Sequence, residues 1–203
     1  MRNLIEQHFP VYDEELLRTL EEHAKIEHVK RGEVLIRNGE MQEKLPILLS
    51  GVYRGYILDD EGHDVTDCFA CVPGDVIMGC SALGDPSRVN VEVVVEGDIL
   101  MLPLEDILNM LENSRDMMLT YNQMLLDALS RHWELKVLLL RSSAMTRYQW
   151  FLRKFPGLID HVSNKHVASF LGMTPVTLSR LRQRLKDTTG STSGLLTDPP
   201  RRI

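Results

Sequence analysis

Residues 164–184 constrain the fold more than any other stretch of this sequence, because they specify two short helices joined by a tight turn. Ser163 is a good N-cap for the first helix, since its side-chain oxygen can accept a hydrogen bond from a free backbone N–H. Gly172 falls at the end of that helix, where a left-handed backbone costs glycine little. Thr174 caps the second helix, and Pro175 fits its first turn without losing a hydrogen bond. The stretch is therefore predicted to form a helix-turn-helix.

The two sides of the second predicted helix differ in chemistry. Leu178, Leu181 and Leu185 form an apolar stripe that is expected to pack against the first helix. The other side carries hydrogen-bonding and cationic side chains, which read base edges or bind phosphates when such a helix enters the DNA major groove. With the cap and the first helix, the candidate DNA-binding residues are Lys165, Thr174, Val176, Thr177, Ser179, Arg180, Arg182, Gln183 and Arg184. An ordinary helical hairpin in a core is the alternative, and it leaves this polar cluster unexplained.

The candidates have different expected roles. Arg180 is the expected contact to a base or a phosphate, and Val176 is placed to touch a thymine methyl group. Lys165, Arg182 and Arg184 are expected to hold the DNA backbone, which fixes the register of a protein on the duplex without reading its sequence.

The distribution of charge supports a phosphate-binding face. The net charge of −6 argues against a general nucleic-acid binder. The acidic residues, however, crowd the N-terminal two thirds of the chain, whereas residues 141–184 hold eight Lys and Arg residues and the single acid Asp160. A basic helix face that is merely solvated is the alternative interpretation.

The first hundred residues predict a helix followed by short strands. Residues 1–27 contain a helical stretch with Leu16, Leu17, Leu20 and Ala24 at helix spacing. Turn signals such as Asn38-Gly39 and Pro73-Gly74 then separate short β-prone runs, which favours an antiparallel barrel or sandwich. These runs are 33–36, 47–49, 52–57, 91–95 and 99–102, and residues 59–62 are predicted to join two strands as a hairpin.

A long helical pattern follows from about Leu104 to Ser142, with a break near Asn113-Ser114. Apolar residues near a heptad spacing within it and just beyond it suggest a pairing face, with Arg131 intruding at one position. These residues are Met117, Tyr121, Met124, Ala128, Leu135, Leu138 and Met145. We expect the helix to pair with a second copy of the chain, and a helix packed on its own barrel is the alternative.

Taken together, these segments resemble the cyclic-AMP receptor protein / fumarate-nitrate regulator (Crp/Fnr) family of bacterial transcription regulators over nearly the whole chain. Residues 30–35 (KRGEVL), 49–51 (LSG), 73–75 (PGD) and 102–106 (LPLED) are similar to turns and strand ends of its effector-binding β-roll. The resemblance implies an α+β fold with three parts, namely a cyclic-nucleotide-binding-like antiparallel β-roll, a dimerisation helix and a helix-turn-helix domain in the form of a shortened winged helix. The expected boundaries are 1–112, 113–142 and 143–203. It also implies a dimeric, sequence-specific regulator whose β-roll senses an effector.

The expected effector pocket departs from the family pattern. In members that bind cyclic nucleotide, a glutamate after a glycine binds the ribose and an arginine before a serine binds the phosphate. The corresponding candidates here are Gly79, Cys80, Ser81, Ser87 and Arg88. Cys80 stands where the glutamate is expected, and Arg88 is displaced by about one residue, which turns a strand side chain to the other face. Cyclic AMP is therefore not the expected effector, and the pocket binds another ligand or none.

The C-terminal tail also departs from the family, which usually supplies a β-hairpin wing after the recognition helix. Residues 188–203 are rich in Gly, Ser, Thr and Pro, and Leu195-Leu196 is their one apolar pair. This composition predicts a shortened wing or a disordered tail.

The cysteines offer an alternative sensing chemistry. Cys68 and Cys71 form a Cys-x-x-Cys pair with Cys80 nine residues further on, a spacing that can serve a redox or metal-sensing site. A fourth ligand is not obvious, although His63 lies nearby. Small buried hydrophobic residues are the preferred interpretation, and no metal or other cofactor is expected.

Other classes of function fit less well. The sequence has no nucleophile–base motif and no phosphate-binding glycine loop, so an enzyme is not expected. A small-molecule-binding β-barrel without DNA binding remains a further alternative. A cytoplasmic location is expected, because the chain lacks a signal-peptide pattern and any apolar run of about 18 residues. The expected partners are double-stranded DNA with a pseudo-palindromic operator, a second copy of the chain, RNA polymerase and a small-molecule effector, but no membrane.

Overall fold

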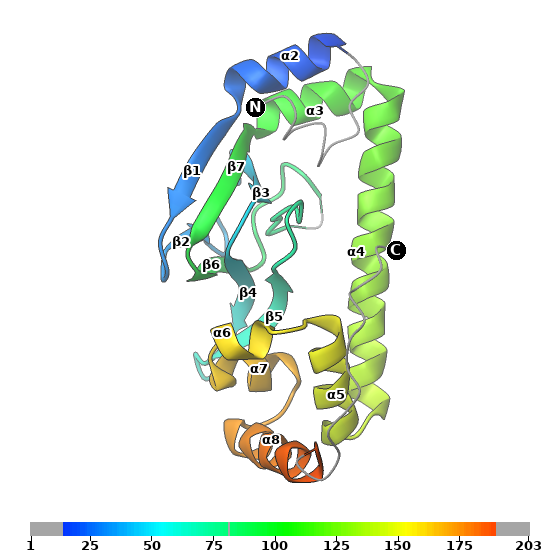
Figure 1. Cartoon of the computed structure of the whole chain (residues 1–203). Helices are drawn as coiled ribbons and strands as arrows, with labels where there is room; N and C mark the ends of the chain where they lie inside the picture. Colours follow the sequence, from blue (N-terminus) through cyan, green and yellow to red (C-terminus); the bar gives the residue numbers. More distant parts are fainter. Residues whose placement is uncertain (1–13, 81, 190–203) are drawn as a thin grey trace.

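The computed structural model describes residues 14–80 and 82–189. Their N-terminal part comprises one helix and seven strands: α2 (Glu14–His23), β1 (Lys25–Val29), β2 (Val34–Ile36), β3 (Lys44–Leu48), β4 (Val52–Leu58), β5 (Asp64–Ala70), β6 (Asn90–Val95) and β7 (Gly97–Pro103). The remainder is helical: α3 (Leu104–Asn113), α4 (Arg115–Arg141), α5 (Ala144–Lys154), α6 (Leu158–His161), α7 (Asn164–Phe170) and α8 (Pro175–Thr189). In Figure 1, α4 runs along one side of the β-roll, and α5–α8 lie at one end of it.

The strands form two antiparallel sheets, with strand orders β1-β7-β3 and β2-β6-β4-β5. Side chains from both sheets share one core, in which Leu48 and Ile99 of the first sheet pack with Tyr53 and Val93 of the second. Alternating burial along β7 and β6 reflects the two faces of each strand. The expected antiparallel β-roll and the α+β fold class are confirmed.

The helical stretch predicted within residues 1–27 is confirmed as α2, but the strand that follows it was not predicted. α2 ends at His23, and residues 25–29 form β1. Residues 25–29 pair in register with residues 97–101 of β7. Only one residue of this segment, Val29, is buried, so its sequence gives a weak strand signal. The pairing with β7 decides the conformation of residues 25–29.

The long helix breaks where the sequence predicted a break. α3 ends at Asn113, and the Ser114 hydroxyl accepts a hydrogen bond from the backbone N–H of Met117 at 3.3 Å, which caps α4. α4 then continues without interruption to Arg141 and connects the β-roll to the last helices (Figure 1).

The face of α4 that the sequence assigned to pairing packs against the chain's own body. Met117 is buried with α2 and α3, and Tyr121 packs against the same cluster. Leu135 packs with the C-terminal helices. Four of the large apolar side chains that α4 leaves exposed recur every seven residues on another face, which we call the outer stripe. The outer stripe consists of Leu119, Leu126, Trp133 and Leu140.

The C-terminal helices dock onto β5 through aromatic rings. Phe69 of β5 lies 6.2 Å from Phe151, 6.2 Å from Phe155 and 5.2 Å from Phe170, measured between ring centroids. All three pairs have the edge-to-face geometry that aromatic rings favour. Val52 and Val94 of the β-roll belong to the same core cluster as the C-terminal helices, so the β-roll and the helix-turn-helix share a packed interface.

Candidate nucleic-acid interface

The helix-turn-helix has the local structure that its sequence specifies. Ser163 accepts a hydrogen bond from the backbone N–H of His166 at 3.3 Å and caps α7. Gly172 adopts a φ of 59°, the left-handed conformation that glycine tolerates best. Thr174 Oγ1 accepts from the backbone N–H of Thr177 at 3.2 Å, and α8 begins at Pro175. Each of these capping predictions is confirmed.

The recognition helix α8 buries one side and exposes the other. Leu178 and Leu181 are buried, and Leu185 packs against the same core. On the exposed side Val176 has 60% of its surface accessible. The other fully exposed candidates are Thr174, Ser179, Arg180, Gln183 and Arg184, and Thr177 is half-buried.

Two of the candidate DNA-binding residues are bound within the chain. Arg182 is half-buried, and its Nη1 donates to Asn164 Oδ1 at 2.7 Å. Its Nη2 also lies 3.9 Å from the carboxylate of Asp160. Lys165 pairs with the carboxylate of Asp64 on β5, although its side chain remains 63% exposed. Arg182 therefore braces the helix-turn-helix, while Lys165 joins it to the β-roll.

Asp64 belongs to a charged network that the sequence analysis did not find. Arg54 of β4 is 3% exposed and binds both Asp64 and Glu92, the latter through Nε at 2.5 Å. Burial of the Asp64 carboxyl raises its pKa, but the hydrogen bonds and charges of Lys165 and Arg54 outweigh burial and lower the pKa to about 2. The strand that carries Asp64, β5, also contacts α7: the backbone N–H of Thr66 donates to Ser169 Oγ at 2.8 Å.

The expected effector pocket is partly closed by its own residues. The buried Ser87 hydroxyl lies within hydrogen-bond distance of the carbonyl oxygens of Gly79 (3.0 Å) and Val89 (2.6 Å). A Cβ atom added at Gly79 would come within 2.0 Å of that hydroxyl oxygen, so the two residues are in direct contact. Arg88 is exposed, Cys80 is half-buried, and Ser81 lies outside the described residues. The space beside Gly79 is thus filled by Ser87.

Comparisons with known proteins agree with this architecture. Residues 26–114 match the cyclic nucleotide-binding domain family. Among solved structures, FixK2 from Bradyrhizobium japonicum superposes with a TM-score of 0.73 at 21% identity, covering 85% of this chain and 89% of that one. A structure described as a transcriptional regulator of the Crp/Fnr family from Eubacterium rectale gives 0.72 at 19% identity, covering 91% and 89%. The c-di-GMP responsive regulator CLP from Xanthomonas campestris gives 0.64 at 14% identity, covering 87% and 93%.

The chain has the Crp/Fnr fold. The match of residues 26–114 and the three structural neighbours, at 14–21% identity, agree with the fold that the sequence motifs predicted. No curated protein sequence matched the chain. In residues 14–80 and 82–189, no helix is long and apolar enough to cross a membrane. The predicted wing lies mostly outside the described residues, because α8 extends to Thr189 and the tail that follows is not described.

Within this Crp/Fnr fold, the three cysteines do not gather into a metal site. The part of the chain that the structure describes holds no group of three or more His, Cys, Asp or Glu side chains able to bind one ion. Burial, followed by the charge of Asp67, raises the pKa of the Cys68 thiol to about 12. Burial, followed by the charge of Asp75, raises the pKa of Cys71 to about 11. Both groups are therefore protonated thiols at neutral pH, which makes them weak nucleophiles and weak ligands.

We expect Cys68 to react with a thiol reagent much more slowly than Cys80 in the native protein. The reactive species is the thiolate, and a raised pKa keeps the thiol protonated until the pH passes that value. The side chain of Cys80 is less buried than that of Cys68, and burial, followed by the charge of Asp85, raises its pKa. Reaction rates at mildly alkaline pH, resolved by peptide mass spectrometry, measure the difference. Unfolding should equalise the three rates, whereas native Cys68 reacting as fast as Cys80 would contradict the assignment.

Proposed function

We propose that the protein is a dimeric, sequence-specific DNA-binding transcription regulator of the Crp/Fnr type. The exposed face of α8 carries the proposal, because it presents Val176, Arg180 and Gln183 outward while Leu178 is buried behind them. A helix that enters the major groove N-terminus first needs hydrogen-bonding and apolar groups on that face. Two of the structural neighbours, the Crp/Fnr protein from Eubacterium rectale and CLP, are described as regulators, which supports the regulatory role.

The outer stripe of α4 supports the dimer. Its four apolar side chains repeat at seven-residue intervals, the spacing at which two helices supercoil around each other. Leu140 is 78% exposed, so a large apolar surface stays in water unless a second chain covers it. A two-fold dimer places the two copies of α8 about one DNA turn apart, roughly 34 Å, and therefore calls for a pseudo-palindromic operator.

The effector is not cyclic AMP in this proposal. A cyclic phosphate needs a cationic side chain and free N–H groups directed at one point. Here Ser87 occupies the space beside Gly79, and Arg88 is exposed rather than enclosed. Cys80 also lacks the carboxylate that the family uses for the ribose. The β-roll provides the framework that positions α4 and the helix-turn-helix, while the cyclic-nucleotide chemistry is missing.

Selection of bound fragments from random DNA tests the proposal directly. The protein should enrich a two-fold symmetric site, and its affinity should fall steeply with salt because bound phosphates release counterions. Arg180→Ala is expected to weaken binding by about 1–3 kcal/mol and to relax one position of each half-site, as loss of a bidentate base contact does.

Arg115→Ala is the matched control, since Arg115 is exposed at the far end of α4. It should change neither the affinity nor the selected site. A uniform loss over all sequences for Arg180→Ala would make Arg180 a phosphate contact. Failure of the parent protein to prefer any sequence would overturn the proposed function itself.

A further inference from the structure

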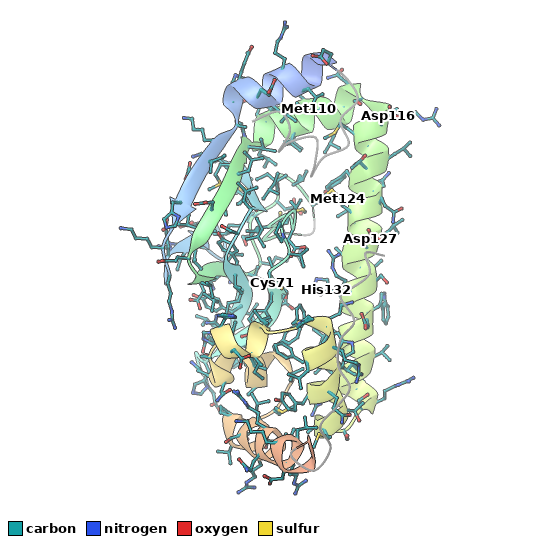
Figure 2. The ribbon with its side chains drawn as sticks, viewed as in Figure 1. Cys71, Met110, Asp116, Met124, Asp127 and His132 are labelled. Atoms are coloured by element: carbon teal, nitrogen blue, oxygen red, sulfur yellow. The ribbon has the colours of Figure 1, made fainter. Side chains whose placement is uncertain are left out.

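A cavity of about 410 Å³ lies where the β-roll, α4 and the C-terminal helices meet. Its walls come from β5 and the loop after it, from the middle of α4, and from α5 and α7. In Figure 2, Cys71 and His132 mark its two sides, one on the β-roll and one on α4. The cavity is separate from Gly79 and Ser87, and its volume lies in the range of small-molecule sites.

The base of the cavity is aromatic. Phe69, Trp150, Phe155 and Phe170 line it, and Trp150 lies 6.0 Å from Phe155 and 6.3 Å from Phe170 between ring centroids. The indole N–H of Trp150 donates to Glu134 at 2.7 Å, which fixes the ring in place. A flat apolar or aromatic group can pack against these rings without displacing them.

The α4 wall of the cavity carries a cationic side chain, Arg131, and an imidazole, His132, that have no partner among the described residues. Arg131 lies on the inner side of α4, in line with Met117, Met124 and Leu135, where the remaining positions are apolar. Neither Arg131 nor its neighbour His132 makes a hydrogen bond or an ion pair within the described residues. Lys154, which also lines the cavity, is already bound to Glu134 at 3.0 Å. Arg131 and His132 are therefore the groups available to an acid.

The opposite wall carries an available carboxylate. In the pairing of β4 with β5, Gly55 faces Cys68 and Tyr56 faces Thr66, so Asp67 is an extra residue in a β-bulge. Bulges redirect a side chain, and they are common beside binding sites. The Asp67 carboxylate accepts a hydrogen bond from the Cys68 thiol but forms no ion pair with a described residue. The other acid of this wall, Asp75, already accepts hydrogen bonds from the backbone N–H groups of Cys71 and Val72.

We propose that this cavity binds an amino acid with an aromatic side chain. The carboxylate binds Arg131 and His132, the ammonium group binds Asp67, and the ring packs against the aromatic base. A ligand with both charges fits better than a simple anion, because the unpaired groups have opposite signs and stand on facing walls. Such a ligand would bridge the β-roll, α4 and the helix-turn-helix. That it would thereby regulate α8 rests on the proposed function, whereas binding itself does not.

Tryptophan fluorescence tests the binding without DNA. The chain has two tryptophans, so Trp133→Phe on the outer stripe leaves Trp150 of the cavity as the single reporter. L-phenylalanine should change the emission saturably. 3-Phenylpropionate lacks the ammonium group and 2-phenylethylamine lacks the carboxylate, so each should bind about ten-fold more weakly or worse, as the loss of a hydrogen bond to a charged group implies. An analogue that binds as tightly as phenylalanine would overturn the proposal.

Matched variants test which residues bind the carboxylate and the ammonium group of the ligand. Arg131→Ala and Asp67→Asn, made in the reporter chain, should each weaken phenylalanine binding about ten-fold or more. Arg115→Ala and Asp116→Asn remove the same charges at the start of α4, outside the cavity, and should leave binding unchanged. Equal losses in the controls, or no saturable change with phenylalanine at millimolar concentrations, would refute the site. The analogue series needs no substitution at Arg131 or Asp67, so it decides the question even if Asp67→Asn fails to fold.

Discussion

Leu126→Asp is expected to make the protein monomeric and to weaken its binding to a two-half-site operator by about 10²–10⁴-fold, because the second half-site then loses its tethered partner. Leu126 lies at the centre of the outer stripe and is 60% exposed in the single chain. A carboxylate placed there costs nothing in the monomer, but it must lose its water in a helix–helix contact. Sedimentation equilibrium measures the dimer, and titration of a duplex with two half-sites measures the affinity.

The same substitution at another leucine with a similar exposed fraction provides the control. Leu58, at the end of β4, is 59% exposed, so Leu58→Asp should fold, remain dimeric and bind DNA like the parent. A single half-site duplex adds a second check, since its affinity should be similar for parent and Leu126→Asp. If Leu126→Asp remains a dimer, α4 does not pair through the outer stripe, and the proposed operator symmetry loses its basis.

Periodicity alone does not choose between the two apolar faces of α4. Met117, Tyr121 and Met124 have the apolar character of a pairing face, and so do Leu119 and Leu126 two residues further on. A helix with apolar residues around much of its circumference fits two registers equally well. α2 and α3 cover Met117 and Tyr121 of the first set, which favours the second set as the pairing face.

The helix-turn-helix could be predicted in detail because its determinants are local. The caps Ser163 and Thr174 act within three residues of themselves, and Gly172 acts through its own backbone. Turn residues in the same way predict where several strands end along the chain and where the helix breaks before α4. Local rules missed β1, whose conformation depends on β7, about seventy residues away in the sequence.

The interface between the β-roll and the helix-turn-helix could not be predicted, because its contacts join distant segments. Thr66 and Ser169, which share a hydrogen bond, are 103 residues apart. Phe69 contacts three rings whose positions in the sequence suggest only core residues. In the sequence alone, Arg54 cannot be told from an ordinary surface cation. Only the pairing of β4 with β5 and β6 places it between two carboxylates.

We expect Arg54→Met to lower the free energy of unfolding at neutral pH by about 3–5 kcal/mol, because it leaves two carboxylates without their buried partner. Denaturant unfolding of parent and variant measures the difference. The effect should depend on pH in a defined direction. The pKa of Asp64 is lowered from its ordinary 3.8 to about 2 in the folded protein, so its contribution is present above about pH 4 and is lost as the pH falls toward 2. The gap between parent and variant should therefore narrow over that interval.

Lys165→Met distinguishes the contribution of the buried Arg54–Asp64 pair to stability from that of the exposed Lys165–Asp64 pair. Lys165 binds the same carboxylate, but its side chain is 63% exposed, and solvent screening limits such a pair to about 1 kcal/mol or less. If Arg54→Met costs no more than Lys165→Met, the buried network does not stabilise the fold. Lys165 is also a candidate DNA contact, so Lys165→Met should reduce the salt dependence of DNA binding by about one phosphate contact. Arg54 is buried and should leave that slope unchanged under conditions where the variant is folded.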